Sequence, residues 1–338
     1  MKIIVDAFGG DNAPDEVIKG AVRAVNELGV EIVLTGDKNK IEESAKKLGL
    51  SLDKISVAHT SEVFDIHEEP VKIVKTGKNT SMGLGLKMLH DGEGDAFVSA
   101  GSTGALVVGS TMIVKRIKGV KRVALAPLIP AEKGQFMLLD AGANNDCRPE
   151  MLLQFAIMGS AYMEKVMGIK NPKIALANIG EEETKGRELE LEAYKLLKDS
   201  ELNFCGNIEG RDIPKGDINV IVSDGFTGNI ILKLYEGMGK FFSNKLKYIL
   251  SGINGKLSAL LVLGKIKAFK KQMDYTEIGG SLMLGACRPV IKAHGSSDAN
   301  AFFNAIRQAK KCVDGKFIDE IAEAVSKTTG KERPQNDE

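Results

Sequence analysis

The chain alternates short apolar runs with longer amphipathic stretches. The apolar runs are rich in β-branched residues, as is typical of strands buried on both faces. They are Ile3–Val5, Glu31–Leu34, Ala96–Ser99, Phe136–Asp140, Ile174–Ala177 and Val220–Ser223. The stretches between them have helical length and include Glu16–Leu28, Lys40–Leu48, Ser81–His90 and Glu188–Leu197. This alternation predicts an α/β protein of three layers, in which helices cover both faces of a mostly parallel sheet.

Polar or glycine-rich loops follow most of these predicted strands. They are Asp6–Asp11, Ser99–Gly104, Asp140–Asn144, Asn178–Gly180 and Ser223–Gly225. Ligands of open α/β sheets bind beyond the carboxyl ends of the strands, so we expect these loops to share one site. We find no internal repeat and no long linker, which predicts one catalytic unit over residues 1–330. The polar residues 331–338 are expected to form a frayed tail.

One segment, residues 240–271, departs from this pattern. It contains eight lysines and no acidic residue. Its apolar residues recur at helical spacing on both sides of the Gly252–Gly255 turn signal. The segment is therefore predicted to be a basic amphipathic helical hairpin that projects from the catalytic unit.

Composition excludes several broad classes. The 338 residues include 46 basic and 45 acidic side chains, a formal net charge of +1, and nucleic-acid binders usually carry a strong basic excess. The four cysteines show no CxxC spacing, which favours a reducing compartment. The first apolar run reaches Asp6 too early for a signal peptide, and no run approaches the ~20 residues of a membrane span. We expect a cytoplasmic protein that does not bind nucleic acid.

The motifs of several enzyme classes are missing. The chain has no GxxxxGK[ST] phosphate loop, no GxSxG nucleophile elbow, no HExxH and no GxGxxG after the first strand. The four histidines His59, His67, His90 and His294 are dispersed, so no metal site is predicted.

The remaining candidate chemistry is anion binding. The loop Gly101–Gly104 follows a strand and opens a helix, where unpaired N–H groups and close backbone approach favour a phosphate. A simple helix cap explains the same loop equally well. In the second loop Asn229 and Lys233 share a helix face at i, i+4 spacing, while Asp224 has the position of an N-cap.

Two further segments carry candidate groups. Lys185 lies in a loop that could bind an anion, although the neighbouring glutamates are expected simply to open a helix. His294 begins a polar segment that ends near Asn300. An isolated histidine is more often packed structurally than catalytic, and Asp298 has the position of a helix cap.

Taken together, these segments resemble the bacterial phosphate acyltransferase family, which begins phospholipid synthesis. The matching motifs are VDAFGGDNAP, VSAGSTGA, LLDAGAN, NIGEE followed by KG, VSDGFTGN and HGSSDA, in that order from Val5 to Ala299. The resemblance implies an isocitrate/isopropylmalate dehydrogenase-like fold, no cofactor and a homodimer. It also implies the reaction of acyl-[acyl carrier protein] with inorganic phosphate to give acyl phosphate and free carrier protein.

The resemblance and the strand-end positions together define the expected site. Catalytic roles are expected for Lys185, Asn229, His294 and Asp224, and phosphate binding for Gly101, Ser102, Thr103 and Gly104. Further pocket residues are expected at Asp6, Gly9, Gly10, Asp11, Asn144, Gly225, Lys233 and Asn300. A thioester is already activated and phosphate is itself the nucleophile, so such a site needs positioned donors rather than a covalent nucleophile.

Alternative functions remain open at this point. A phosphotransacetylase acting on a CoA thioester would need much the same phosphate site. A β-decarboxylating dehydrogenase shares the implied fold, but its acidic metal ligands and nucleotide loop are not evident in the sequence. A phosphate- or lipid-binding protein without activity is the third alternative.

Partner surfaces are also expected. Acyl carrier proteins are strongly acidic, and the basic cluster Lys115, Arg116, Lys118, Lys121 and Arg122 would suit their docking, although lysines at an exposed helix end explain it equally well. The hairpin is expected to join two subunits. Its apolar tip is formed by Ile253, Leu257, Leu260, Leu261 and Leu263, flanked by lysines as in segments that lie on anionic membranes. Burial of this tip within the dimer is the competing interpretation.

Overall fold

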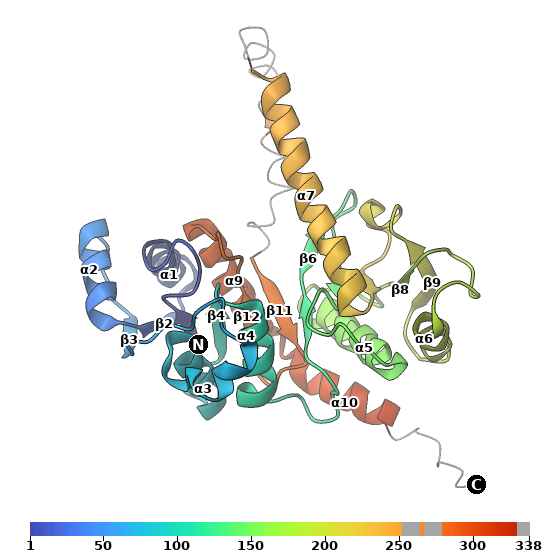
Figure 1. The fold of residues 1–338 in the computed structure, drawn as a ribbon, viewed down its shortest axis with the longest axis horizontal. Helices are drawn as coiled ribbons and strands as arrows, with labels where there is room; N and C mark the ends of the chain where they lie inside the picture. Colours follow the sequence, from blue (N-terminus) through green and yellow to red (C-terminus); the bar gives the residue numbers. More distant parts are fainter. Residues whose placement is uncertain (252–263, 267–278, 330–338) are drawn as a thin grey trace.

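The computed structural model describes residues 1–251, 264–266 and 279–329. The predicted α/β class is confirmed, and the six strands and four helices named from the alternating pattern are present. The mostly parallel strands are divided between two sheets that lie side by side (Figure 1).

The first sheet has seven strands in the order β3-β2-β1-β4-β12-β11-β5. All of its neighbouring pairs are parallel except the two that β11 makes with β12 and β5. The strands are β1 (Lys2–Asp6), β2 (Glu31–Gly36), β3 (Ile55–His59), β4 (Ala96–Ser99), β5 (Ala124–Ala126), β11 (Ser281–Leu284) and β12 (Val290–Lys292).

Helices cover both faces of this first sheet because its side chains alternate between two cores. Ile3 and Val5 of β1 pack on the side of α1 (Asp15–Leu28) and α9 (Ala299–Gly315), whereas Ile4 packs on the side of α3 (Ser81–Asp91). The sheet is flanked by α2 (Lys38–Leu48) and α4 (Thr103–Gly109), with single turns at Pro70–Val74, Gly77–Asn79 and Ser110–Val114.

The second sheet has five strands in the order β6-β7-β10-β8-β9, with only the β6–β7 pair antiparallel. Its strands are β6 (Leu128–Pro130), β7 (Gln135–Leu139), β8 (Ile174–Asn178), β9 (Phe204–Glu209) and β10 (Val220–Val222). One face packs against α5 (Pro149–Lys165) and α6 (Glu188–Lys198). The other packs against the first turns of α7 (Gly225–Ile249), where Leu232 and Tyr235 contact the core.

The two sheets are joined at two places. The chain passes from β5 to β6 through Pro127, so one short run of backbone belongs to both sheets. At the C-terminus α9 packs on the first sheet, while α10 (Phe317–Thr329) packs on α5 beside the second. One core cluster contains residues of both sheets, such as Ile3 and Val220, so the two sheets share a hydrophobic core. A short 3-10 turn lies at Ile213–Lys215, before β10.

The long helix α7 projects from the body of the molecule (Figure 1). It forms the first half of the predicted hairpin up to Ile249, and residues 264–266 are again helical. The expected tip residues Ile253, Leu257, Leu260, Leu261 and Leu263 lie outside the described residues. Among the helices of the described part, none is both long and apolar enough to cross a membrane.

Candidate functional site

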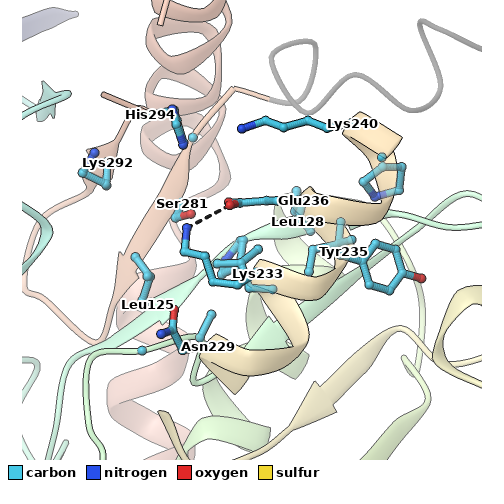
Figure 2. A pocket seen from close by; sticks show the side chains of 18 of the residues that line it. Leu125, Leu128, Asn229, Lys233, Tyr235, Glu236, Lys240, Ser281, Lys292 and His294 are labelled. Carbon is cyan, nitrogen blue, oxygen red and sulfur yellow. Dashed lines mark hydrogen bonds and ion pairs between the residues drawn. The ribbon is translucent and has the colours of Figure 1, made fainter. Parts of the chain in front are cut away.

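A cavity of about 790 Å³ lies where the two sheets meet. Strand ends of both sheets reach it: Thr103 follows β4, Gly142 follows β7, Asn229 follows β10 and His294 follows β12. One side of α7 forms a long wall of the cavity (Figure 2). The strand-end loops therefore converge as the sequence pattern predicts.

One part of the cavity wall is strongly cationic. Lys233, Lys240 and Lys247 project from α7, Lys292 ends β12, and the only carboxylate among the lining residues of the described chain is Glu236. Glu236 Oε2 lies 2.8 Å from Lys233 Nζ, an i, i+3 ion pair (Figure 2). A single carboxylate cannot balance four ammonium groups, so the cavity attracts anions.

Lys292 occupies an unusual position for a lysine, at the end of a strand inside the first sheet. Its Nζ donates to the carbonyl of Ala100 at 3.3 Å and to the carbonyl of Ala293. Burial, and to a smaller extent the charge of Lys233, lowers the pKa of Lys292 to about 8, while Asp11 and Glu236 oppose the shift. At neutral pH this amine remains largely protonated but gives up its proton more readily than an exposed lysine.

His294 lies beside this lysine. Its Nδ1 accepts from the backbone N–H of Ser296 at 3.3 Å, an arrangement that places the ring proton on Nε2. Burial lowers the pKa of His294, and the positive charges of Lys292, Lys233 and Lys240 act in the same direction against the charge of Glu236. The imidazole is therefore mainly uncharged at neutral pH, a donor rather than a cation.

The other part of the wall is apolar. It is formed by the β5–β6 segment and by α7 residues that face it: Leu125, Pro127, Leu128, Ile129, Pro130, Leu232 and Tyr235. The Tyr235 ring packs edge-on against Phe136, with ring centroids 5.8 Å apart, and burial raises the pKa of Tyr235 to about 12. The cavity can thus hold an anion and an alkyl chain side by side.

A buried carboxylate organises the loop after β4. Asp6 accepts from Ser99 Oγ at 2.7 Å, and Ser99 Oγ accepts from Gly101 N at 3.1 Å. A side chain at Gly9 would meet Asp6, Gly101 and Ser99 within 3 Å. Burial raises the pKa of Asp6. Asp6 and Gly9 thus hold the Ser99–Gly104 loop in place and do not line the cavity.

A second buried carboxylate, Asp140, holds the loop after β7. It accepts from the backbone N–H groups of Leu125, Gly142, Ala143 and Asn144, at 2.7–3.2 Å, and from Asn144 Nδ2 at 2.8 Å. Because Leu125 lies on β5, this carboxylate fixes the two sheets relative to each other. Gly142 has φ +130°, a region that favours glycine, and its backbone faces Asn229.

Four of the residues predicted from the sequence line the cavity: Thr103, Asn229, Lys233 and His294. Other predicted residues do not line the cavity but hold the loops and helix starts next to it. Ser102 Oγ caps α4 by accepting from Ala105 N at 3.4 Å. Gly10 and Gly104 pack closely against Ala100 and Pro70, respectively, and Gly225 against the carbonyl of Asn144.

The other predicted residues have contacts elsewhere. Asp224 Oδ1 accepts from Thr227 N at 2.6 Å as the N-cap of α7, and Oδ2 pairs with Arg187. Lys185 is exposed in the loop before α6 and does not line the cavity. Asn300 accepts from Arg23 Nη1 at 2.9 Å, and the backbone N–H of Asp11 donates to Gly295 O at 2.8 Å.

Several lining residues were not singled out from the sequence as site residues, namely Glu236, Lys240, Lys247 and Lys292. Lys292 had a readable signal, because a lysine within the apolar run Val290–Ala293 needs a reason to be there. Lys240 and Lys247 were recognised only as members of the basic segment 240–271, since lysine on an amphipathic helix gives no sign of a cavity.

Comparison with known proteins agrees with this architecture. Residues 1–320 match the family model described as fatty acid synthesis protein. Phosphate acyltransferase from Clostridium botulinum strain Langeland is 51% identical over 323 residues, covering 95% of this chain and 96% of the relative.

Solved structures share the fold at low identity. A phosphotransacetylase from Streptococcus pyogenes superposes with a TM-score of 0.63 at 19% identity, covering 93% of this chain and 94% of its own. A structure assigned to 4-hydroxythreonine-4-phosphate dehydrogenase from Salmonella typhimurium gives 0.51 at 12%, covering 92% and 99%. The dehydrogenase-like fold expected from the sequence is confirmed. The chain belongs to the phosphate acyltransferase family of fatty acid synthesis proteins.

Proposed function

We propose that this protein transfers a fatty acyl group from the thioester of acyl carrier protein to inorganic phosphate, giving an acyl phosphate. The observation that supports this most strongly is the pairing of a cationic wall with an apolar wall in one cavity. The cationic side suits phosphate, and the apolar side suits an acyl chain.

The cavity residues provide the positioning that the reaction requires. Lys233 and Asn229, one turn apart on α7, would hold the phosphate dianion beside the thioester carbonyl. The uncharged His294 would donate to the carbonyl oxygen as negative charge develops there. Positioned donors of this kind commonly contribute the largest share of a rate enhancement, and they replace a covalent nucleophile here.

The identity of the acyl donor is tested by comparing two thioesters of the same acyl chain. Purified protein is given phosphate with either acyl-[acyl carrier protein] or acyl-CoA, and acyl phosphate is trapped with hydroxylamine. We expect a much higher kcat/KM with the carrier protein. A preference for acyl-CoA would instead make the protein a phosphotransacetylase, and no acyl phosphate from either donor would reject the proposed activity.

A basic surface hollow is the proposed docking site for the acidic carrier protein. Its volume is about 660 Å³, and its charged lining residues are Arg116, Lys121, Arg122, Asp146 and Arg148. The structure thus adds Arg148, at the start of α5, to the basic cluster expected from the sequence. Arg122 in the hollow and Leu125 in the cavity are three residues apart, at most about 11 Å between Cα atoms.

Charge reversal in this hollow is expected to weaken carrier binding alone. The double variant Arg122→Glu/Arg148→Glu should raise KM for acyl carrier protein about ten-fold, increasingly so at low salt, and leave KM for phosphate unchanged. Lys40→Glu/Lys46→Glu, at two exposed positions on α2, is the matched control with two reversed charges. Equal carrier KM values for the wild type and the double variant would remove this hollow from the proposal.

The exposed face of α7 supports a proposal of homodimerisation. Its apolar residues Phe226, Ile230, Leu234, Met238, Phe241, Phe242, Tyr248 and Ile249 are each at least 41% exposed. They recur mostly every three or four residues, so they form a stripe along one side of the projecting helix. The same stripe of a second subunit would bury this surface.

We propose that the apolar tip of the hairpin, which includes Leu260 and Leu261, contacts anionic membranes from the cytoplasm.

The double variant Leu260→Glu/Leu261→Glu separates these two roles. Wild type is expected to sediment with anionic liposomes at low salt and to be released by salt, because each lysine near such a surface contributes about 1 kcal/mol. The variant should remain dimeric by light scattering and stay in the supernatant. Wild type in the supernatant would exclude membrane contact, and a monomeric variant would assign the tip to the dimer interface.

A further inference from the structure

Three lysines of the cavity differ in their surroundings. Lys233 is paired with Glu236 at 2.8 Å, and Lys240 lies farther along α7 toward its projecting end. Lys292 instead ends a strand of the first sheet, on the side opposite α7, with its ammonium held by the carbonyls of Ala100 and Ala293. These two bonds fix the side chain and leave it one further N–H.

The groups around Lys292 define its electrostatic environment. Lys233 and Glu236 face it from α7, Asp11 from the loop after β1, and His294 follows it on its own segment. Burial and Lys233 favour loss of its proton, and the two carboxylates only partly oppose them. His294 is mainly uncharged, so Lys292 is the better proton donor of the two.

Resting on the acyl transfer proposed above, we propose that Lys292 is the general acid that protonates the departing thiolate. An oxygen of HPO₄²⁻ forms a bond to the thioester carbon, and the carbon–sulfur bond breaks. The sulfur keeps the bonding electron pair and takes a proton from the Lys292 ammonium, giving the free thiol. The lysine amine then recovers a proton from the P–OH of the acyl phosphate, which is a stronger acid than the ammonium, since even a phosphate monoester loses this proton near pH 6. No net proton is consumed.

The acidity of Lys292 suits this step. The pKa of about 8 is close to the roughly 8.5 of a cysteine thiol, and general acids work best when their pKa lies near the operating pH. With an alkyl thioester, kcat should fall as pH rises through about 8, because the ammonium form disappears. This descending limb should be absent when the leaving thiolate needs no proton.

The test compares two leaving groups in three proteins. Lys292→Met is expected to lower kcat for an acyl-pantetheine thioester by about 10²–10⁴-fold, but to lower kcat for an aryl thioester of the same acyl chain only a few-fold, because an aryl thiolate leaves unprotonated. Lys292→Arg keeps the positive charge but cannot readily give up a proton, so it should show the same selective loss.

The aryl thioester also serves as the control for folding and phosphate binding. Equal losses with both thioesters, or full rescue by Lys292→Arg, would overturn the proposal and leave Lys292 a positioning or phosphate-binding charge. Failure of the wild type to form acyl phosphate from any thioester would instead reject the proposed function itself.

Discussion

Lys233→Met is expected to lower kcat/KM for phosphate by about 10²–10³-fold, the typical cost of removing one positioned donor from a site that stabilises negative charge. The Lys233 side chain is 59% exposed and pairs with Glu236 on the same helix, so the variant should fold normally. Its loss also leaves Glu236 without its ion-pair partner, which lowers the positive potential of the anion site. Steady-state kinetics with varied phosphate measure the effect.

Glu236→Gln is the matched control, because it removes the other member of the same ion pair. Taking away the only carboxylate among the described lining residues raises the positive potential of the cavity. KM for phosphate should therefore fall, opposite in sign to the effect of Lys233→Met. If both variants weaken phosphate binding, the ion pair itself is needed, and Lys233 is not a separate phosphate ligand.

Among the glycines of the described residues, Gly228 is the one at which substitution by alanine should destabilise the protein most. A Cβ at Gly228 would lie 1.8 Å from the carbonyl oxygen of Asp140 and 2.7 Å from Ser223 Oγ. Helix α7 would have to move away from the loop that fixes the two sheets. We expect a loss of about 3 kcal/mol or more in the free energy of unfolding, measured by urea denaturation.

Gly237→Ala on the same helix is the control. Among the described residues of this subunit no atom lies within 4 Å of a Cβ at this position, so alanine meets no clash there and mainly changes the helix propensity. Alanine should stabilise α7 by about 0.5–1 kcal/mol. Unfolding free energies that change equally in both variants would show that the close approach at Gly228 does not hold α7 in place.

The sequence predicted the architecture well where local pattern and packing agree. Buried strands such as Ala96–Ser99 and helices such as Ser81–Asp91 are recognisable because apolar periodicity and capping residues point to the same element. The division into two sheets was not predictable. It arises because the chain leaves the first sheet after β5 and enters the second at β6, with only Pro127 between the two strands. Short strands give no signal about which sheet they join.

The sequence indicated which loops reach the cavity better than it indicated which side chains line it. Asn229 and His294 line the cavity as expected, whereas Asp224 caps a helix and Lys185 lies elsewhere on the surface. A polar residue at a strand end can either face the ligand or hold the loop that does, and these two roles give the same sequence pattern. Asp6 and Asp140 hold loops in place, since each carboxylate is buried and accepts hydrogen bonds from the residues around it.

Acyl transfer is proposed to take place in the cavity between the two sheets. Crystallography of the protein with phosphate and a non-hydrolysable acyl thioester analogue tests it most directly. We predict a phosphate bound among Asn229, Lys233 and His294, with the acyl chain along the β5–β6 wall. Phosphate bound only in the Arg116–Arg148 hollow, or an acyl chain outside the cavity, would contradict acyl transfer at this place.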